Sequence, residues 1–242
     1  EQPPHRSIST WEPGPDVGFQ LLLSPRRAGR RVPRGPIPHL PAGKATIYPD
    51  ANVEEVSTSD RKRATNADIE ALTENVVGQI IDGELIALPR ATARHNRLVV
   101  KLLGVLLPAF DDALGNIGGW IFLSKTELHL GDDVLVPDIV GWRGSEPAEI
   151  DEPFLTIAPD FICEVLSPST AEIARRRKLP IYAKAGIGHA WLLDPEAESF
   201  EVFRRAGEGW AVACAWSADA RLRAEPFESI EIDLGKLWPN RP

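Results

Sequence analysis

Two acidic residues lie in segments that otherwise favour β-strands. Asp138 ends the run Val134-Leu-Val-Pro-Asp, and Glu164 lies within Asp160-Phe-Ile-Cys-Glu-Val-Leu-Ser. A carboxylate among apolar side chains is costly unless a positive charge neutralises it. Two such carboxylates on neighbouring strands predict a binding site for Mg²⁺, which takes oxygen ligands and usually keeps several waters.

The alternation of side chains along a strand decides where these acids point. Glu164 shares one face with Ile162 and Leu166, whereas Cys163 points to the other face. Asp138 shares a face with Val136 if residues 134–142 form one strand. One pairing register of the two strands then puts the carboxylates side by side, and both can ionise only if a cation lies between them.

Lys178 and Glu84 complete the candidate site. Lys178 follows the Glu164 strand on a predicted helix, and its ammonium could orient a water and offset charge on a phosphate. Glu84 stands beside the Asp82-Gly83 turn and could extend the ligand shell of the metal. Both also have an ordinary explanation as solvated surface charges, because Lys178 ends a basic run and Glu84 adjoins a turn.

Four other polar residues have a simpler structural explanation. We expect His95 to be a helix cap or a surface group, and Tyr182 and Asp194 to support packing and turn geometry. Ser167 is predicted to cap the loop that enters the helix, because no Gly-x-Ser-x-Gly motif surrounds it.

Periodicity and turn residues predict an α/β fold with one central mixed β-sheet flanked by helices. A short helix is expected after Thr65, a hairpin around Asp82-Gly83, and a helix from Thr92 to Phe110. A further helix from Glu172, kinked at Pro180, is expected to stop at Gly186. The other expected strands lie at 119–124, 127–130, 134–142, 160–167, 189–193, 200–204, 210–216 and 230–234.

The chain of 242 residues divides unevenly. Residues 1–60 are rich in proline and lack any helical or strand period, so they predict an irregular, disordered extension. Residues 64–242 are expected to form one domain of ordinary size. The sequence contains no methionine, and we hypothesise that the natural start lies near Val56 and that the segment before it is not native.

Composition limits the function further. The net charge is −8, which argues against a broad, salt-driven nucleic-acid surface, although it allows contact with phosphate through metal and a few local cations. The two cysteines, Cys163 and Cys214, form no metal-binding pattern. We expect both to be buried thiols in a reducing cytoplasm. The apolar runs are too short for a membrane span.

Several motifs occur in an order that resembles a known family. They are Gln79-Ile-Ile-Asp-Gly-Glu84-Leu, Pro137-Asp138, Pro159-Asp160-Phe-Ile-Cys-Glu164-Val-Leu-Ser167, Lys178-Leu-x-x-Tyr182 and Trp191-Leu-Leu-Asp194-Pro. Together they resemble the Uma-two family of putative restriction endonucleases, part of the PD-(D/E)xK nuclease superfamily. The resemblance extends from about residue 66 to residue 238.

This resemblance implies a restriction-endonuclease-like core and Mg²⁺-dependent hydrolysis of nucleic-acid phosphodiesters, with Mn²⁺ as a substitute. Asp138 corresponds to the Asp of the Pro-Asp element and Glu164 to the second acid, and a backbone carbonyl near Val165 would assist them. Leu166 occupies the usual lysine position, and Lys178 on the next helix takes its place. The resemblance also implies 5′-phosphate and 3′-hydroxyl products. We interpret the nucleic acid as DNA, although the sequence does not decide between DNA and RNA. A homodimer is expected because nucleases of this fold often pair to cut two strands.

Two rival functions stay open at this stage. A nuclease-fold module that binds nucleic acid or a protein partner without cutting would keep the acids, and Leu166 and the acidic charge favour it. A glycosidase-like carboxylate pair would need no metal and would carry exposed aromatics along a groove. Metal-dependent cleavage distinguishes the nuclease from both.

Overall fold

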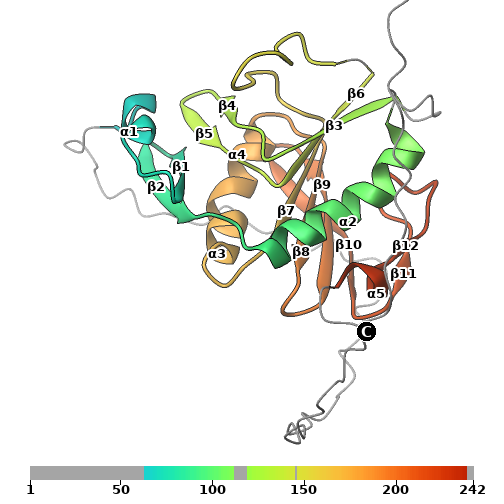
Figure 1. Ribbon diagram of the computed structural model, residues 1–242. Helices are drawn as coiled ribbons and strands as arrows, with labels where there is room; N and C mark the ends of the chain where they lie inside the picture. Colours follow the sequence, from blue (N-terminus) through green and yellow to red (C-terminus); the bar gives the residue numbers. More distant parts are fainter. Residues whose placement is uncertain (1–62, 112–118, 145, 239–242) are drawn as a thin grey trace, which may run out of the picture. The chain divides into compact units, whose positions relative to one another are not determined.

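The computed structural model describes residues 63–111, 119–144 and 146–238 (Figure 1). The predicted extension at residues 1–60 lies outside the described residues. No helix within those three ranges is both long enough and apolar enough to cross a membrane.

A six-stranded mixed sheet forms the centre of the fold, in the order β10-β9-β8-β7-β6-β3. β7 and β8 run parallel, whereas the other neighbours are antiparallel. A parallel pair requires a crossover, and the helical segment between these two strands supplies it. The strands are β3 (Trp120–Ser124), β6 (Ile139–Arg143), β7 (Phe161–Val165), β8 (His189–Asp194), β9 (Ser199–Ala206) and β10 (Gly209–Ser217).

A smaller sheet has the order β2-β1-β5-β4. Its strands are β1 (Val76–Ile81), β2 (Glu84–Pro89), β4 (Leu128–Leu130) and β5 (Asp133–Leu135). The predicted hairpin is confirmed: β1 and β2 pair across Asp82 and Gly83, which both have positive φ, at 54° and 78°. A two-residue turn with positive φ at both positions matches the twist of the strands and favours Asp-Gly.

The helices flank the central sheet. The predicted long helix is confirmed as α2 (Ala93–Phe110), and the side chain of Thr92 caps it by accepting from the backbone N–H of His95 at 3.2 Å. The other elements are α1 (Asn66–Glu70), α3 (Ala171–Ile173), the π-helical turn η2 (Ala174–Lys178), α4 (Leu179–Lys184), α5 (Leu234–Leu237), β11 (Arg221–Leu222) and β12 (Ile232–Asp233).

The two faces of the central sheet carry separate cores. Cys163 and Val165 of β7 pack with Leu102 of α2 on one face, and Ile162 packs with Tyr182 of α4 on the other. The predicted alternation along the Glu164 strand is therefore confirmed. Glu164 lies on the same face as Ile162 and Leu166, where α4 and the smaller sheet pack.

Three expectations about elements and burial are wrong. The expected strand at 134–142 is two strands, β5 and β6, which belong to different sheets. Pro137 lies between β5 and β6. Proline has no N–H to donate to a neighbouring strand, which explains why the strand is interrupted there. The strand expected at 230–234 contains only β12, since Leu234 already begins α5. Cys163 is buried as expected, but Cys214 on the edge strand β10 is exposed.

Candidate metal and phosphodiester site

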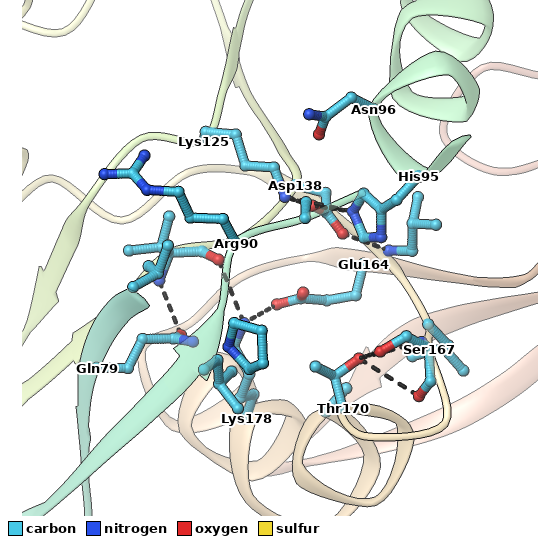
Figure 2. A pocket seen from close by; sticks show the side chains of 18 of the residues that line it. Gln79, Arg90, His95, Asn96, Lys125, Asp138, Glu164, Ser167, Thr170 and Lys178 are labelled. Atoms are coloured by element: carbon cyan, nitrogen blue, oxygen red, sulfur yellow. Dashed lines mark hydrogen bonds and ion pairs between the residues drawn. The ribbon is translucent and has the colours of Figure 1, made fainter. Parts of the chain in front are cut away.

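The two predicted acids line one open cavity of about 1520 Å³. Figure 2 shows Asp138 and Glu164 in this cavity with Lys125, His95 and Lys178 around them. Both acids are buried, Asp138 at 3% exposure and Glu164 at 6%. Such burial requires the charge of each carboxylate to be compensated nearby.

The register of β6 and β7 explains why the acids meet. Ile139 lies opposite Cys163 and Val140 opposite Ile162 in this antiparallel pair. By the same register Asp138, the residue before Ile139, lies beside Glu164, the residue after Cys163. The register therefore brings together two residues that are far apart in the sequence, although Asp138 is not itself in a strand.

Glu164 is held by two residues from the helical crossover. The ammonium of Lys178 lies 2.5 Å from Oε1 of Glu164, and the hydroxyl of Tyr182 donates to the same oxygen at 2.6 Å. The predicted approach of Lys178 to the end of β7 is confirmed. Tyr182, expected to support packing, also hydrogen-bonds directly to the candidate ligand.

The π-helical turn η2 ends at Lys178, two residues before Pro180. The backbone N–H of Leu179 donates to the carbonyl of Ala174, five residues back. Pro180 has no N–H, and its ring would crowd the preceding turn of a regular α-helix. The wider turn accommodates the proline, and Lys178 and Tyr182 then lie one turn apart on the face toward Glu164.

Asp138 is held by three donors from three parts of the chain. The backbone N–H of Val165 donates to Oδ2 at 2.7 Å, and Nε2 of His95 lies 2.7 Å from Oδ1. The ammonium of Lys125 also contacts Oδ1. The N–H of Val165 ties the orientation of Asp138 directly to the strand that carries Glu164.

The two carboxyl groups have opposite pKa shifts. Burial and the charge of Asp138 raise the pKa of Glu164, although Lys178 and Tyr182 oppose this. Burial also acts to raise the pKa of Asp138, but His95 and Lys125 outweigh it and lower that pKa. A second positive charge near Glu164 would favour its ionised form.

His95 and Lys125 were not predicted as site residues. His95, expected to be a cap or surface group, lies in the first turn of α2 and points its ring at Asp138 (Figure 2). Lys125 lies in the turn after β3, and its backbone N–H donates to the carbonyl of Asp138 at 3.2 Å. Only the tertiary structure reveals both, because nothing in the local sequence around either residue points to Asp138.

Glu84 does not join the other candidates. Its Oε2 pairs with the guanidinium of Arg177 at 2.8 Å, its side chain is 62% exposed, and it is absent from the cavity lining. Gln79 of β1 lines the cavity instead, and its Oε1 accepts from the backbone N–H of Val136 at 3.0 Å. The geometry therefore gives Glu84 a surface ion pair and no place in the cavity.

The remaining predicted residues have local partners. Ser167 hydrogen-bonds to Thr170 through both its backbone N–H and its hydroxyl, at the start of the helical crossover. Asp194 accepts from the backbone N–H groups of Glu196 and Ala197, both at 2.9 Å, so its predicted part in turn geometry is confirmed.

The donor set fits a hard divalent cation that keeps much of its water. Within the described ranges, no three His, Cys, Asp or Glu side chains group as metal ligands. Two carboxylates on adjoining backbone segments remain, and Mg²⁺ is commonly bound through one or two carboxylates and water. In this structure a lysine ammonium contacts each carboxylate, so the site can hold a divalent cation if at least one of the two ammonium groups moves away from its carboxylate.

Comparison with known proteins identifies the family and the fold of this chain. A family model described as Uma2, "Putative restriction endonuclease", matches residues 68–235. The crystal structure of a putative nuclease belonging to DUF820 from Anabaena variabilis superposes with a TM-score of 0.58 and 22% sequence identity. The match covers 72% of this chain and 97% of that chain, which shows a shared fold. No curated protein matches.

Proposed function

Since this chain belongs to the Uma2 family of putative restriction endonucleases, which supports a nuclease function in general terms, we propose that it is a Mg²⁺-dependent endonuclease acting on DNA. The observation that carries the proposal is the pair Asp138 and Glu164. They come from adjoining segments, are both buried, and line the same cavity. Such a charge arrangement is costly for stability alone and is typical of a functional site.

Asp138 and Glu164 would hold Mg²⁺ or Mn²⁺, and the bound ion would stabilise charge on the phosphoryl group and lower the pKa of water. His95 and the N–H of Val165 orient the Asp138 carboxylate. Tyr182 performs the same task for Glu164. These fixed partners limit the rearrangement that binding requires.

Lys178 is proposed to orient the attacking water. Its side chain is only 5% exposed and lies between Oε1 of Glu164, at 2.5 Å, and the carbonyl of Val136, at 3.4 Å. A buried ammonium beside the carboxylates can donate to a water and offset charge that develops on the phosphate. Lys178, from the helical segment, therefore supplies the ammonium group that a lysine at the position of Leu166 would otherwise supply.

Positively charged side chains at the cavity would offset the negative charge of the DNA phosphates that approach the site. The exposed residues Arg90 and Arg94 line the same cavity, from the loop before α2 and its first turn. Arginine and lysine side chains supply the sequence-independent part of binding to phosphates. This cationic edge supports nucleic acid as the substrate despite the net charge of −8.

Two features of the rest of the chain enter the proposal. The two free cysteines support a reducing cytoplasm as the compartment. One site cuts one strand, so double-strand cleavage would use two copies of the chain.

A nuclease-fold module that binds without cutting is the second candidate. Lysines neutralise both acids, and Leu166 fills the usual lysine position. Such a module would bind DNA equally well with or without a divalent ion and would leave it uncut.

Cleavage of supercoiled plasmid and of single-stranded DNA tests the proposal. We expect nicking in Mg²⁺ or Mn²⁺ and none in chelator. Asp138→Asn should reduce the rate by roughly 10²-fold or more, because the metal contributes several kcal/mol to transition-state stabilisation. Glu84→Gln is the matched control, since Glu84 pairs with Arg177 outside the cavity lining. Nicking that persists in chelator, or that Asp138→Asn leaves unchanged, would refute the proposal.

A further inference from the structure

The two lysines that neutralise the acids differ in how firmly they are held. The side chain of Lys178 is 5% exposed and that of Lys125 is 40% exposed. The side chains of the two acids that they contact are both buried; taken without the backbone, they are 8% exposed for Glu164 and 4% for Asp138. Moving Lys178 away from Glu164 would leave a buried ammonium without its partner, whereas the ammonium of Lys125 can turn into solvent and be hydrated there.

The backbone anchors Lys125 while its side chain stays adjustable. Lys125 has a φ of 56° in the turn after β3, and its N–H donates to the carbonyl of Asp138. Its ammonium contacts Oδ1 of Asp138 and lies 3.3 Å from Nε2 of His95. The long side chain can change rotamer without any movement of this turn.

The two oxygens of Asp138 differ in the kind of donor that holds them. Oδ2 of Asp138 accepts the backbone N–H of Val165, which the β7 strand fixes. Among the residues that the structure describes, Oδ1 accepts from two side chains, those of His95 and Lys125. Removal of the ammonium would free a lone pair on Oδ1 while His95 and Val165 keep the carboxylate in place.

We propose that Lys125 is an exchangeable counter-ion of Asp138, which a divalent cation displaces from Oδ1. This inference rests on the proposed function and adds to it a residue that competes with the metal ion for Asp138. In the metal-free protein the ammonium of Lys125 balances the charge of the Asp138 carboxylate, which His95 and Val165 hold in place. In the metal-loaded protein the displaced ammonium stays tethered at the cavity that it lines, where a DNA phosphate would be its new partner.

Calorimetric titration with Mn²⁺ in the absence of DNA tests the proposal. Lys125→Met removes the competing charge, so we expect Mn²⁺ to bind it about fivefold to tenfold more tightly than the unaltered protein. Lys125→Arg keeps a positive charge and should bind Mn²⁺ no more tightly than the unaltered protein. Lys236→Met makes the same charge change at an 83% exposed site paired with Asp233, and it should leave the affinity unchanged.

Thermal unfolding provides a second measurement. In chelator, Lys125→Met should melt below the unaltered protein because Asp138 has lost a partner, and Mn²⁺ should raise its melting temperature by more than it raises that of the unaltered protein. Equal or weaker Mn²⁺ binding by a folded Lys125→Met would overturn the inference and leave the proposed function intact. If Mn²⁺ binds none of the proteins, or binds Asp138→Asn as well as the unaltered protein, the proposed function fails and this inference with it.

Discussion

At the scale of single residues, the site depends on matched charges that are removed from water. Glu164 and Lys178 are both buried and lie 2.5 Å apart. Ion pairs of this kind add little net stability compared with apolar residues, but the loss of one partner leaves an unpaired buried charge. The pair is therefore better explained by a chemical function than by stabilisation of the fold.

A double-mutant cycle on this pair follows from that argument. In chelator near pH 7, Glu164→Gln and Lys178→Met should each lower the free energy of unfolding by about 3–5 kcal/mol, because each leaves a buried charge without its counter-charge. The double variant should lose less than the sum of the two. Urea unfolding measures all four proteins, and additive losses would mean that the two side chains do not interact.

The pH dependence of stability provides a second residue-scale prediction. The folded-state pKa of Glu164 is raised above its ordinary 4.5, mainly by burial. The folded protein therefore keeps this proton where the unfolded chain has lost it. The contribution of Glu164 to stability is complete below pH 4.5 and is lost as the pH rises through the folded-state pKa.

Urea unfolding of the unaltered protein and of Glu164→Gln in chelator, between pH 4 and pH 8, isolates this contribution. As the pH rises, the unfolding free energy of the unaltered protein should fall relative to that of Glu164→Gln. The contribution of Asp138 to stability depends on pH in the opposite direction, because the pKa of Asp138 is lowered in the folded state. This contribution is complete above pH 3.8 and is lost as the pH falls through the folded-state pKa. A difference that is independent of pH would contradict the shift at Glu164.

At the residue scale, the sequence predicted where a side chain lies when that side chain broke a pattern. Glu164 interrupts an apolar strand, and Lys178 follows it on the next helix, so both could be recognised without coordinates. His95 and Lys125 contact Asp138 through the tertiary structure and belong to no local pattern. Glu84 illustrates the reverse error, because its nearness to a turn does not show which partner it meets, and Arg177 is that partner.

At the scale of elements, the break between β5 and β6 positions Asp138. Alternation alone predicted one strand from 134 to 142, but Pro137 ends the ladder and the chain passes from the smaller sheet to the central one. Asp138 thus lies between two sheets rather than on a strand face. The pairing of β6 with β7, which the sequence could only offer as one register among several, then brings it to Glu164.

Gln79 supports this break, and its loss should loosen the site. Its side chain is 3% exposed and accepts from the N–H of Val136, two residues before Asp138. Gln79→Leu leaves that N–H without its partner, so we expect a loss of about 1–3 kcal/mol in unfolding free energy. Mn²⁺ affinity should fall as well.

Gln79→Glu is the matched comparison for this prediction, because it keeps an acceptor oxygen at the same position. At about pH 4, where a buried carboxyl group at this position is protonated and uncharged, it should retain more stability than Gln79→Leu. If Gln79→Leu binds Mn²⁺ as tightly as the unaltered protein, Gln79 does not position Asp138.

At the scale of the whole molecule, an acidic protein is proposed to bind a polyanion. The net charge of −8 opposes broad contact with DNA, so binding should depend on the few cations at the cavity, Arg90, Arg94 and Lys125. Contacts with about three phosphates predict a slope of roughly −2 to −3 for the logarithm of the binding constant against the logarithm of salt concentration.

Fluorescence anisotropy with labelled DNA in Ca²⁺, chosen to limit cleavage, measures this slope. Arg94→Ala should weaken binding and reduce the slope by about one, because it removes one phosphate contact. A slope steeper than about −6 would indicate an extended basic surface and would contradict local binding.

The central claim is that Asp138 and Glu164 bind one divalent cation together. Anomalous diffraction from crystals grown with Mn²⁺ tests it most directly. The account predicts one strong anomalous peak within bonding distance of both carboxylates, with the Lys125 ammonium moved off Asp138. A peak elsewhere, or no peak while Lys125 still contacts Asp138 and Lys178 still contacts Glu164, would contradict it.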